Sequence, residues 1–229
     1  MNFTPLARAL FRRRVSESLS WRGRTQEVQL AQLDYLLRNL RKTRWAADTG
    51  LSEARSYDDF RRLLPATVPY ASLRSYVMRM IEGERDILWP GRTRNFAQSS
   101  GTSDGKSKYI PVTADSFSRC HYRGGADVVA HYLSLYPDSR LFAGKSFILG
   151  GSFANELSLP PGVRVGDLSA NLIENINPLA NLVRVPEKST ALLSDFEVKR
   201  DLIARETMNK NVTNISGVPS WMLSVLVRV

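Results

Sequence analysis

The stretch SSGTSDGKSK, residues 99–108, most constrains the fold of this chain, because it separates two short segments that favour β-strands. Residues 95–98 and 109–112 are short candidates for extended structure that contain Phe96, Tyr109, Ile110 and Val112, whereas the ten residues between them are glycine, serine, threonine, aspartate and lysine. The second segment also contains Pro111, which does not fit the start of a helix. The sequence therefore predicts a strand, a loop and a second strand.

The composition of this loop suits a phosphate group. Glycines let backbone N–H groups converge on an anion, hydroxyl groups donate further hydrogen bonds, and lysines supply positive charge. An ordinary surface loop of the same composition is an equal alternative on these grounds alone. The candidate phosphate-binding residues are Ser99, Ser100, Gly101, Thr102, Ser103, Gly105, Lys106 and Lys108.

Two other loop patterns partly match the same residues. The P-loop of nucleotide triphosphatases needs four residues between its glycines, whereas Gly101 and Gly105 are separated by three. The G-x-S-x-G elbow of serine hydrolases does match residues 101–105, but this pattern is short. Both sites require a helix immediately after the loop, where this sequence predicts a strand that contains Pro111. Neither pattern is favoured.

Helical and extended segments alternate along the chain. Capping signals are expected at Thr25, at Ser56 and in a capping box at Ser194 and Glu197, and Pro219 suits the first position of a helix. The pattern predicts an α/β architecture with helices packed on a mixed β-sheet. Helices are expected at residues 25–43, from 56 to a stop at Pro65, at 72–82, from Thr113 onward, at 167–176, 195–208 and from 219; strands are expected at 146–149 and 212–216.

Composition excludes several classes of protein. No apolar run approaches the roughly 20 residues of a membrane-spanning helix, so we expect a cytoplasmic protein without a membrane contact. The single Cys120 cannot form an internal disulfide, and with two histidines no metal site is expected. Cys120 and His121 would point about 100° apart on a helix, which argues against a nucleophile and its base. The net charge of +10 favours an anionic partner.

The segment SSGTSDGKSKYIPVT resembles the signature of the Gretchen Hagen family of acyl-acid amido synthetases, which belong to the adenylate-forming, luciferase-like enzymes. The segments GERDILWPGRTRNFAQSSGTS, GDLSANLIENI and NVTNISGVPSWML resemble the same family in the same order. The resemblance runs from about Tyr57 to Val229. It implies that residues 1–229 are an incomplete N-terminal adenylation domain of this fold, whose remaining part and small mobile C-terminal domain are absent.

The resemblance also implies an activity. Such enzymes use ATP and Mg²⁺ to convert a small carboxylic acid into an acyl adenylate, and an amino acid then displaces AMP to form an amide. The loop would hold the β- and γ-phosphates of ATP. Val218, Pro219 and Trp221 match the family segment beside the acyl pocket, although Trp221 and Met222 on a helix are also typical core residues. The resemblance assigns no catalytic residue and no metal ligand.

Two functions are carried forward. The first is an acid–amino acid ligase, of which this chain is a fragment that we expect to be inactive alone. The alternative is a non-catalytic basic module that binds an anion or a nucleic acid. Nucleic acid is not expected, because the sequence lacks interleaved aromatic and basic residues. Neither the acid, the amino acid nor the oligomeric state follows from these residues.

Overall fold

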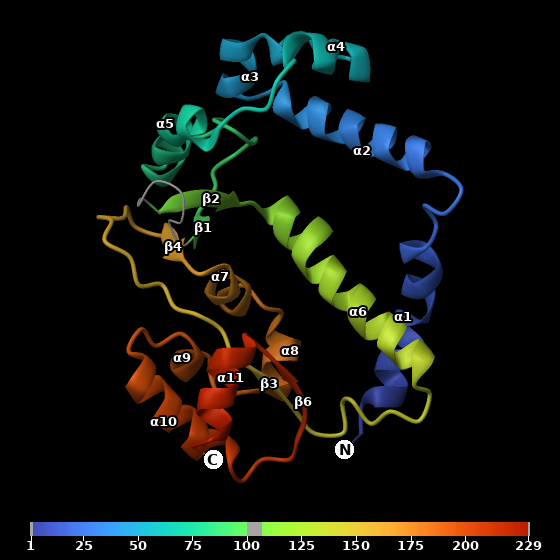
Figure 1. Ribbon diagram of the computed structural model, residues 1–229, viewed down its shortest axis with the longest axis vertical. Coiled ribbons are helices and arrows are strands. Elements are labelled where there is room, and N and C mark those ends of the chain that lie inside the picture. The colour runs from blue at the N-terminus through green and yellow to red at the C-terminus, as the bar shows by residue number, and fades with distance from the viewer. Residues whose placement is uncertain (1, 100–106, 229) are drawn as a thin grey trace. The chain divides into compact units, whose positions relative to one another are not determined.

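The computed structural model describes residues 2–99 and 107–228, and most of its helices and strands are labelled in Figure 1. These residues form two compact units that alternate along the sequence. The sheet unit comprises Met1–Ser18, Asp115–Glu156 and Val165–Val229, and the hairpin unit comprises Leu19–Ala114 and Leu157–Arg164. Each unit has its own buried residues and is described by itself.

The hairpin unit consists of short helices followed by a β-hairpin. Its core lies between the first helices, where Leu37, Ala46, Leu51 and Ala54 are buried. The elements are α2 (Thr25–Leu40), α3 (Arg44–Thr49), the 3₁₀ helix η1 (Leu51–Glu53), α4 (Tyr57–Leu63), α5 (Tyr70–Ile81), β1 (Asn95–Ser99) and β2 (Lys108–Val112).

Strands β1 and β2 are the two strands that the sequence predicted, and they pair in antiparallel fashion. Ser99 lies opposite Lys108, and Phe96 lies opposite Pro111. Strand β2 is the outer strand of its sheet, which is where a proline is tolerated because no neighbouring strand needs its missing N–H group. At the start of β4 (Arg164–Gly166), the N–H of Arg164 donates to the carbonyl of Arg94 at 2.7 Å.

The sheet unit is built around a small parallel sheet with the strand order β5-β3-β6. Strand β3 pairs in parallel with β5 on one side and with β6 on the other. The elements of this unit are α1 (Thr4–Ser18), the π-helix η2 (Ser116–His121), α6 (Tyr122–Leu135), β3 (Lys145–Ile148), α7 (Leu168–Glu174), α8 (Pro178–Val183), β5 (Arg184–Val185), α9 (Lys188–Ala191), α10 (Phe196–Thr207), β6 (Val212–Ser216) and α11 (Pro219–Leu226).

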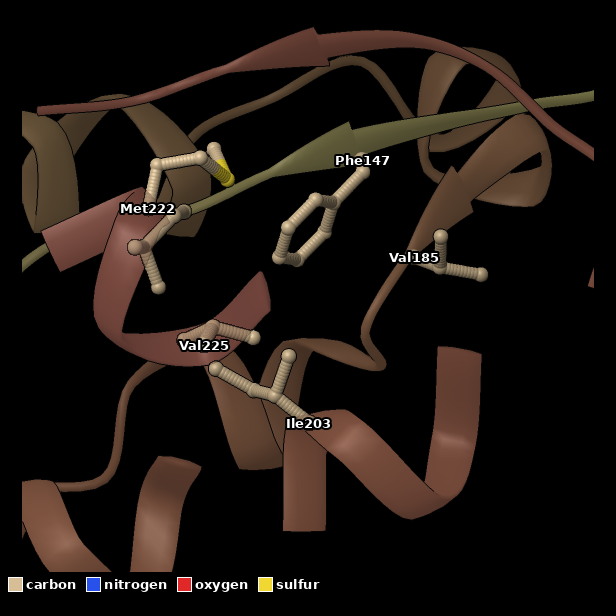
Figure 2. Close-up of a cluster of buried hydrophobic side chains, with 6 residues drawn as sticks. Phe147, Val185, Ile203, Met222 and Val225 are labelled. Atoms are coloured by element: carbon tan, nitrogen blue, oxygen red, sulfur yellow. The ribbon is translucent and has the colours of Figure 1, made fainter. Parts of the chain in front are cut away.

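Helices α10 and α11 pack on the parallel sheet and bury its apolar side chains. Figure 2 shows Phe147 of β3 facing Ile203 of α10 and Val225 of α11. Met222 of α11 and Val185 of β5 complete this view of the cluster. Burial of each such side chain contributes about 1.5–3 kcal/mol relative to exposure, so this cluster fixes the two helices against the sheet.

The first helix of the chain packs on a helix far along the sequence. Arg14 of α1 forms an ion pair with Asp127 of α6, and the Ser18 hydroxyl lies 2.8 Å from Nε2 of His131. Both contacts span 113 residues of sequence. Helix α1 therefore belongs to the sheet unit, although the chain that follows it builds the hairpin unit.

The capping predictions were confirmed in part. The Ser56 hydroxyl accepts a hydrogen bond from the N–H of Asp59 at 3.1 Å, as expected for a helix N-cap. Thr25 is instead the first residue of α2 and does not cap it. The N-cap of α10 is Asp195 rather than Ser194, because the Asp195 carboxylate accepts from the N–H of Val198 at 3.1 Å. Among the described helices, none is long and apolar enough to cross a membrane.

Candidate functional site

Two of the predicted phosphate-binding residues, Ser99 and Lys108, lie at the facing ends of β1 and β2. Ser99 is the last residue of β1 and Lys108 is the first of β2, and the two residues are paired partners. Ser100, Gly101, Thr102, Ser103, Gly105 and Lys106 lie outside the described residues. The structure thus confirms a strand on each side of the predicted loop, and the assignment of phosphate contacts to its residues remains a prediction.

Helix α5 supports β2 just after the loop. The Tyr70 hydroxyl donates to the carbonyl oxygen of Tyr109 at 3.1 Å and accepts from the N–H of the same residue at 2.7 Å. Tyr109 is buried, so its two backbone groups need partners at this outer edge of the sheet. A single side chain of α5 therefore satisfies both backbone groups of the second residue of β2.

Side chains of α5 and β1 also contact Ser107 and Lys108, the two residues that precede Tyr109. Nη1 of Arg74 donates to the carbonyl of Ser107 at 3.1 Å, and Nε2 of Gln98 donates to the Ser107 hydroxyl oxygen at 3.0 Å. The Lys108 amine lies 6.0 Å from the centre of the Tyr70 ring, within range of a cation–π attraction. Sequence reasoning missed Tyr70 and Arg74, whose only signal was their spacing of four residues on one face of α5.

Replacing Tyr70 by phenylalanine is expected to destabilise the hairpin unit by about 1–3 kcal/mol, because both backbone groups of Tyr109 lose their hydroxyl partner. Chemical denaturation of the two proteins measures this difference. Tyr57→Phe in the same unit is the matched control, because the Tyr57 side chain is 48% exposed. We expect a change of about 0.5 kcal/mol or less for the control. Equal stabilities of the Tyr70 variant and the parent protein would contradict the supporting role.

A second group of candidate residues lies at the carboxyl end of the parallel sheet. Strand β3 leads into Gly150 and Gly151, and β6 leads into Gly217 and then α11. The two strand ends stay paired, since the N–H of Leu149 donates to the carbonyl of Ser216 at 2.8 Å. Ligands of open α/β sheets bind at this end of the strands, where loops and helix N-termini converge.

Lys199 of α10 fixes the turn that follows β3. Its side chain is 3% exposed, and Nζ donates to the carbonyl oxygens of Gly150 and Gly151 at 2.7 and 2.9 Å. Burial lowers the pKa of Lys199, and the nearby negative charge of Asp167 opposes this shift. Lys199 was not predicted as a site residue, and its only signal was a lysine on the same helical face as Ile203 and Thr207.

The turn is also bonded to the start of α7. The Ser169 hydroxyl accepts from the N–H of Gly151 at 2.8 Å, and the Asp167 carboxylate accepts from the N–H of Ser152 at 2.9 Å. The approach is too close for a side chain at position 151, because an added Cβ atom would lie 1.9 Å from Oδ2 of Asp167. Asp167 therefore binds the turn, and Asn171, one helical turn further along α7, is fully buried.

The three predicted acyl-pocket residues are found beside this turn at the start of α11. Pro219 is the first helical residue, and Val218, which precedes it, is 49% exposed. Trp221 is 39% exposed, and its ring lies 5.9 Å from the ring of Phe196 between centres. Met222 points the other way into the core. The structure thus separates the core residue of this segment from three residues with accessible surface.

The described residues contain no group of three histidine, cysteine, aspartate or glutamate side chains that could hold a metal ion. The hydroxyl of Ser99 and the amine of Lys108 suit phosphate oxygens instead. A magnesium ion keeps several waters and takes phosphate oxygens and only one or two carboxylates as ligands, so it needs no such cluster of protein groups.

The fold matches that of solved acyl acid amido synthetases. One, described as GH3.15 acyl acid amido synthetase, is 19% identical with a TM-score of 0.70, and the alignment covers 100% of this chain and 39% of that protein. A second, described as AtGH3.15 acyl acid amido synthetase in complex with 2,4-DB, is 21% identical with a TM-score of 0.65 over 88% of this chain and 35% of that protein. The structure is therefore a mixed α/β fold of the kind that forms the N-terminal domain of these synthetases.

The sequence itself defines the family. The profile of the GH3 family N-terminal domain matches residues 17–226, so this chain belongs to the GH3 family. A probable indole-3-acetic acid-amido synthetase GH3.1 of Oryza sativa subsp. japonica is 38% identical over 63 residues, which are 27% of this chain and 10% of that protein. The chain thus spans about two fifths or less of the relatives that it matches.

Proposed function

We propose that this chain contributes to an enzyme that uses ATP to activate a small carboxylic acid as an acyl adenylate and then forms an amide with an amino acid. One observation carries the proposal. In a chain of the GH3 family, Ser99 and Lys108 are paired at the closed end of an antiparallel hairpin, which is the context that the predicted phosphate loop requires. The relatives described as amido synthetases support the same reaction class.

The loop would act on the phosphates of ATP. Adenylyl transfer places negative charge on the departing pyrophosphate, and fixed donors and cations lower the barrier by stabilising that charge. Ser99, Ser100, Thr102 and Ser103 would donate hydroxyl hydrogen bonds, the backbone N–H groups of Gly101 and Gly105 would approach the phosphates, and Lys106 and Lys108 would supply positive charge. Mg²⁺, when bound with ATP, would supply further charge neutralisation.

The acid would bind at the carboxyl end of the parallel sheet. Val218, Pro219 and Trp221 offer apolar surface at the N-terminus of α11, where backbone N–H groups favour a carboxylate. The hydrogen bonds from Lys199 and to Ser169 would keep the neighbouring glycine turn in place. One solved relative is described as a complex with the acid 2,4-DB, which supports a carboxylic acid as the substrate class.

The 229 residues by themselves are expected to give no turnover. They match 39% of the GH3.15 structure, and a phosphate loop without contacts to the adenine and ribose lacks much of what selects a nucleotide. The amino acid would be the second substrate.

The test is acid-dependent exchange of radiolabelled pyrophosphate into ATP, catalysed by the full-length gene product that contains this chain. Formation of an acyl adenylate is reversible, so exchange should appear when Mg²⁺ and a suitable carboxylic acid are present and should vanish when the acid is omitted. Release of AMP with amide formation should then require an amino acid. Absence of exchange across a broad panel of acids, together with anion binding that survives loop mutation, would contradict the proposal and favour the basic binding module.

A further inference from the structure

A basic cavity of about 700 Å³ lies in the sheet unit, at the opposite end of the parallel sheet from the glycine turn. Lys145 is the first residue of β3, Arg184 is the first residue of β5, and Lys210 precedes β6 by two positions. Because the three strands are parallel, these residues mark the amino end of the sheet. Lys188 and Arg205 also line the cavity, which therefore contains five basic side chains.

Arg184 gives the cavity a fixed cationic group in its wall. It is 5% exposed, and burial lowers its pKa, an effect that the nearby charge of Glu206 opposes. Nε and Nη2 donate to the side-chain oxygen of Asn181 at 3.1 and 2.8 Å, and Nη1 donates to the carbonyl of Pro186 at 2.7 Å. A guanidinium has five N–H donors, so these three bonds orient Arg184 and leave two donors for another acceptor.

The two acidic residues of the cavity do not cancel its charge. Glu206 accepts hydrogen bonds from the N–H of Glu187 at 2.8 Å and from the Thr190 hydroxyl, which hold its carboxylate against the chain. Glu187, the second acidic residue, is exposed to solvent. With five basic and two acidic side chains, the lining has an excess of three positive charges, one of which is offset by the ion pair of Lys188 with Glu174.

Two of the basic side chains are available for a ligand. Within the described part of the chain, neither Arg205 of α10 nor Lys210 has a side-chain hydrogen bond or ion pair, and both are exposed to solvent at the rim. The other lysines are already engaged, because Lys145 donates to the carbonyl of Leu182 at 2.8 Å and Lys188 forms an ion pair with Glu174 at 2.9 Å. The cavity therefore combines an oriented guanidinium in its wall with two uncommitted cations at its rim.

We propose that this cavity binds an anion carrying a phosphate group, at a site separate from the loop of residues 99–108. A planar guanidinium matches the spacing of two phosphate oxygens, and lysine and arginine at the rim would neutralise a dianion. Asn209 and Ser189 also line the cavity and provide neutral donors. The volume exceeds that of one phosphate group, so the ligand is either an inorganic polyphosphate or an organic phosphate ester.

The test is a titration of the 229-residue chain followed by ¹⁵N NMR, with inorganic pyrophosphate and a hexose monophosphate as separate probes at constant ionic strength. Binding should shift the amide signals of residues 184–189 and 205–210. Arg205→Gln combined with Lys210→Gln should weaken binding about tenfold or more, because charge-assisted hydrogen bonds are lost. The matched control is Arg12→Gln with Arg13→Gln, which removes the same charge from exposed positions on α1 and should leave the affinity unchanged.

The proposed site is independent of the adenylation reaction, since Lys108 is not among the described residues that line the cavity. Replacing both Lys106 and Lys108 by alanine should therefore leave these shifts intact. Tighter binding of pyrophosphate would assign an inorganic ligand, and tighter binding of the hexose phosphate an organic one; either result supports the site. The proposal would be overturned by shifts confined to residues near the hairpin or by the absence of shifts with either probe. It would also be overturned if the Arg205→Gln, Lys210→Gln variant and the Arg12→Gln, Arg13→Gln control lost the same affinity.

Discussion

Replacing both Lys106 and Lys108 by alanine is expected to lower the rate of acid-dependent pyrophosphate exchange by about 100-fold or more in the full-length gene product. Hydrogen bonds to a charged partner contribute about 1.5–3 kcal/mol each, and 1.4 kcal/mol corresponds to a tenfold change. Since both lysines would act on the phosphates, the loss should appear in kcat/KM for ATP and leave the KM for the amino acid nearly unchanged.

The control for this variant removes two exposed basic residues elsewhere in the hairpin unit, by Arg22→Ala with Lys42→Ala. It lowers the net charge by the same amount, so any general electrostatic attraction of ATP is reduced equally. We expect the control to retain its exchange rate within about threefold, well short of the tenfold that one lost charged contact would give. If the two double variants behaved alike, the loop would have no specific part in ATP use.

Lys199→Met is expected to reduce the free energy of unfolding by about 2–4 kcal/mol, the largest stability effect that we predict. Methionine fills a similar volume but leaves the carbonyl groups of Gly150 and Gly151 without their donor, and each buried unsatisfied group costs about 1–3 kcal/mol. Chemical denaturation measures the change. Arg205→Met on the same helix is the control, because its exposed side chain should contribute about 0.5 kcal/mol or less.

A stability of Lys199→Met equal to that of the parent would show that the turn holds itself through Ser169 and Asp167 alone. A loss seen equally in Arg205→Met would point to helix propensity or to net charge rather than to the buried amine. The predicted pattern, a loss for Lys199 alone, identifies this residue as the support of the turn after β3.

The hairpin was predictable from sequence because two local signals agreed. The loop between the strands is composed of residues that avoid regular structure, and Pro111 fits only an outer strand. Both strands were found within one residue of their expected ends, and β2 is indeed the outer strand. The Tyr70 contact was not predictable, because it joins residues 39 positions apart, and no local pattern specifies which helix covers the strand.

At the carboxyl end of the parallel sheet, the strands were predictable from local sequence but their contacts with distant residues were not. The expected strand at 146–149 overlaps β3 (Lys145–Ile148), and the expected strand at 212–216 matches β6. The pairing of β3 with β5, a strand of only two residues, was not predictable, because strand signals come from runs of about four or more residues. The role of Lys199 was hidden for a related reason, since a lysine on an amphipathic helix is ordinarily solvated.

The prediction of a helix boundary was wrong where two adjacent residues could serve equally well as the N-cap. Ser194 and Asp195 are both good N-cap residues, and only the three-dimensional structure shows that Asp195 is used. The π-helical turn η2 also lacked any sequence signal, although it carries Cys120 and His121. Its wider turn differs from the regular helix that we expected after Thr113.

The packing of α1 on α6 has a consequence for the order of events on the ribosome. Helix α1 is made early, but the residues it contacts through Arg14 and Ser18 follow 113 positions later. At a synthesis rate of about 5–20 residues per second, α1 waits roughly 6–23 s for its partner. Meanwhile the hairpin unit is synthesised almost entirely and can begin to fold first. The first helix of the chain thus reaches its contacts with α6 only after most of the hairpin unit has been made.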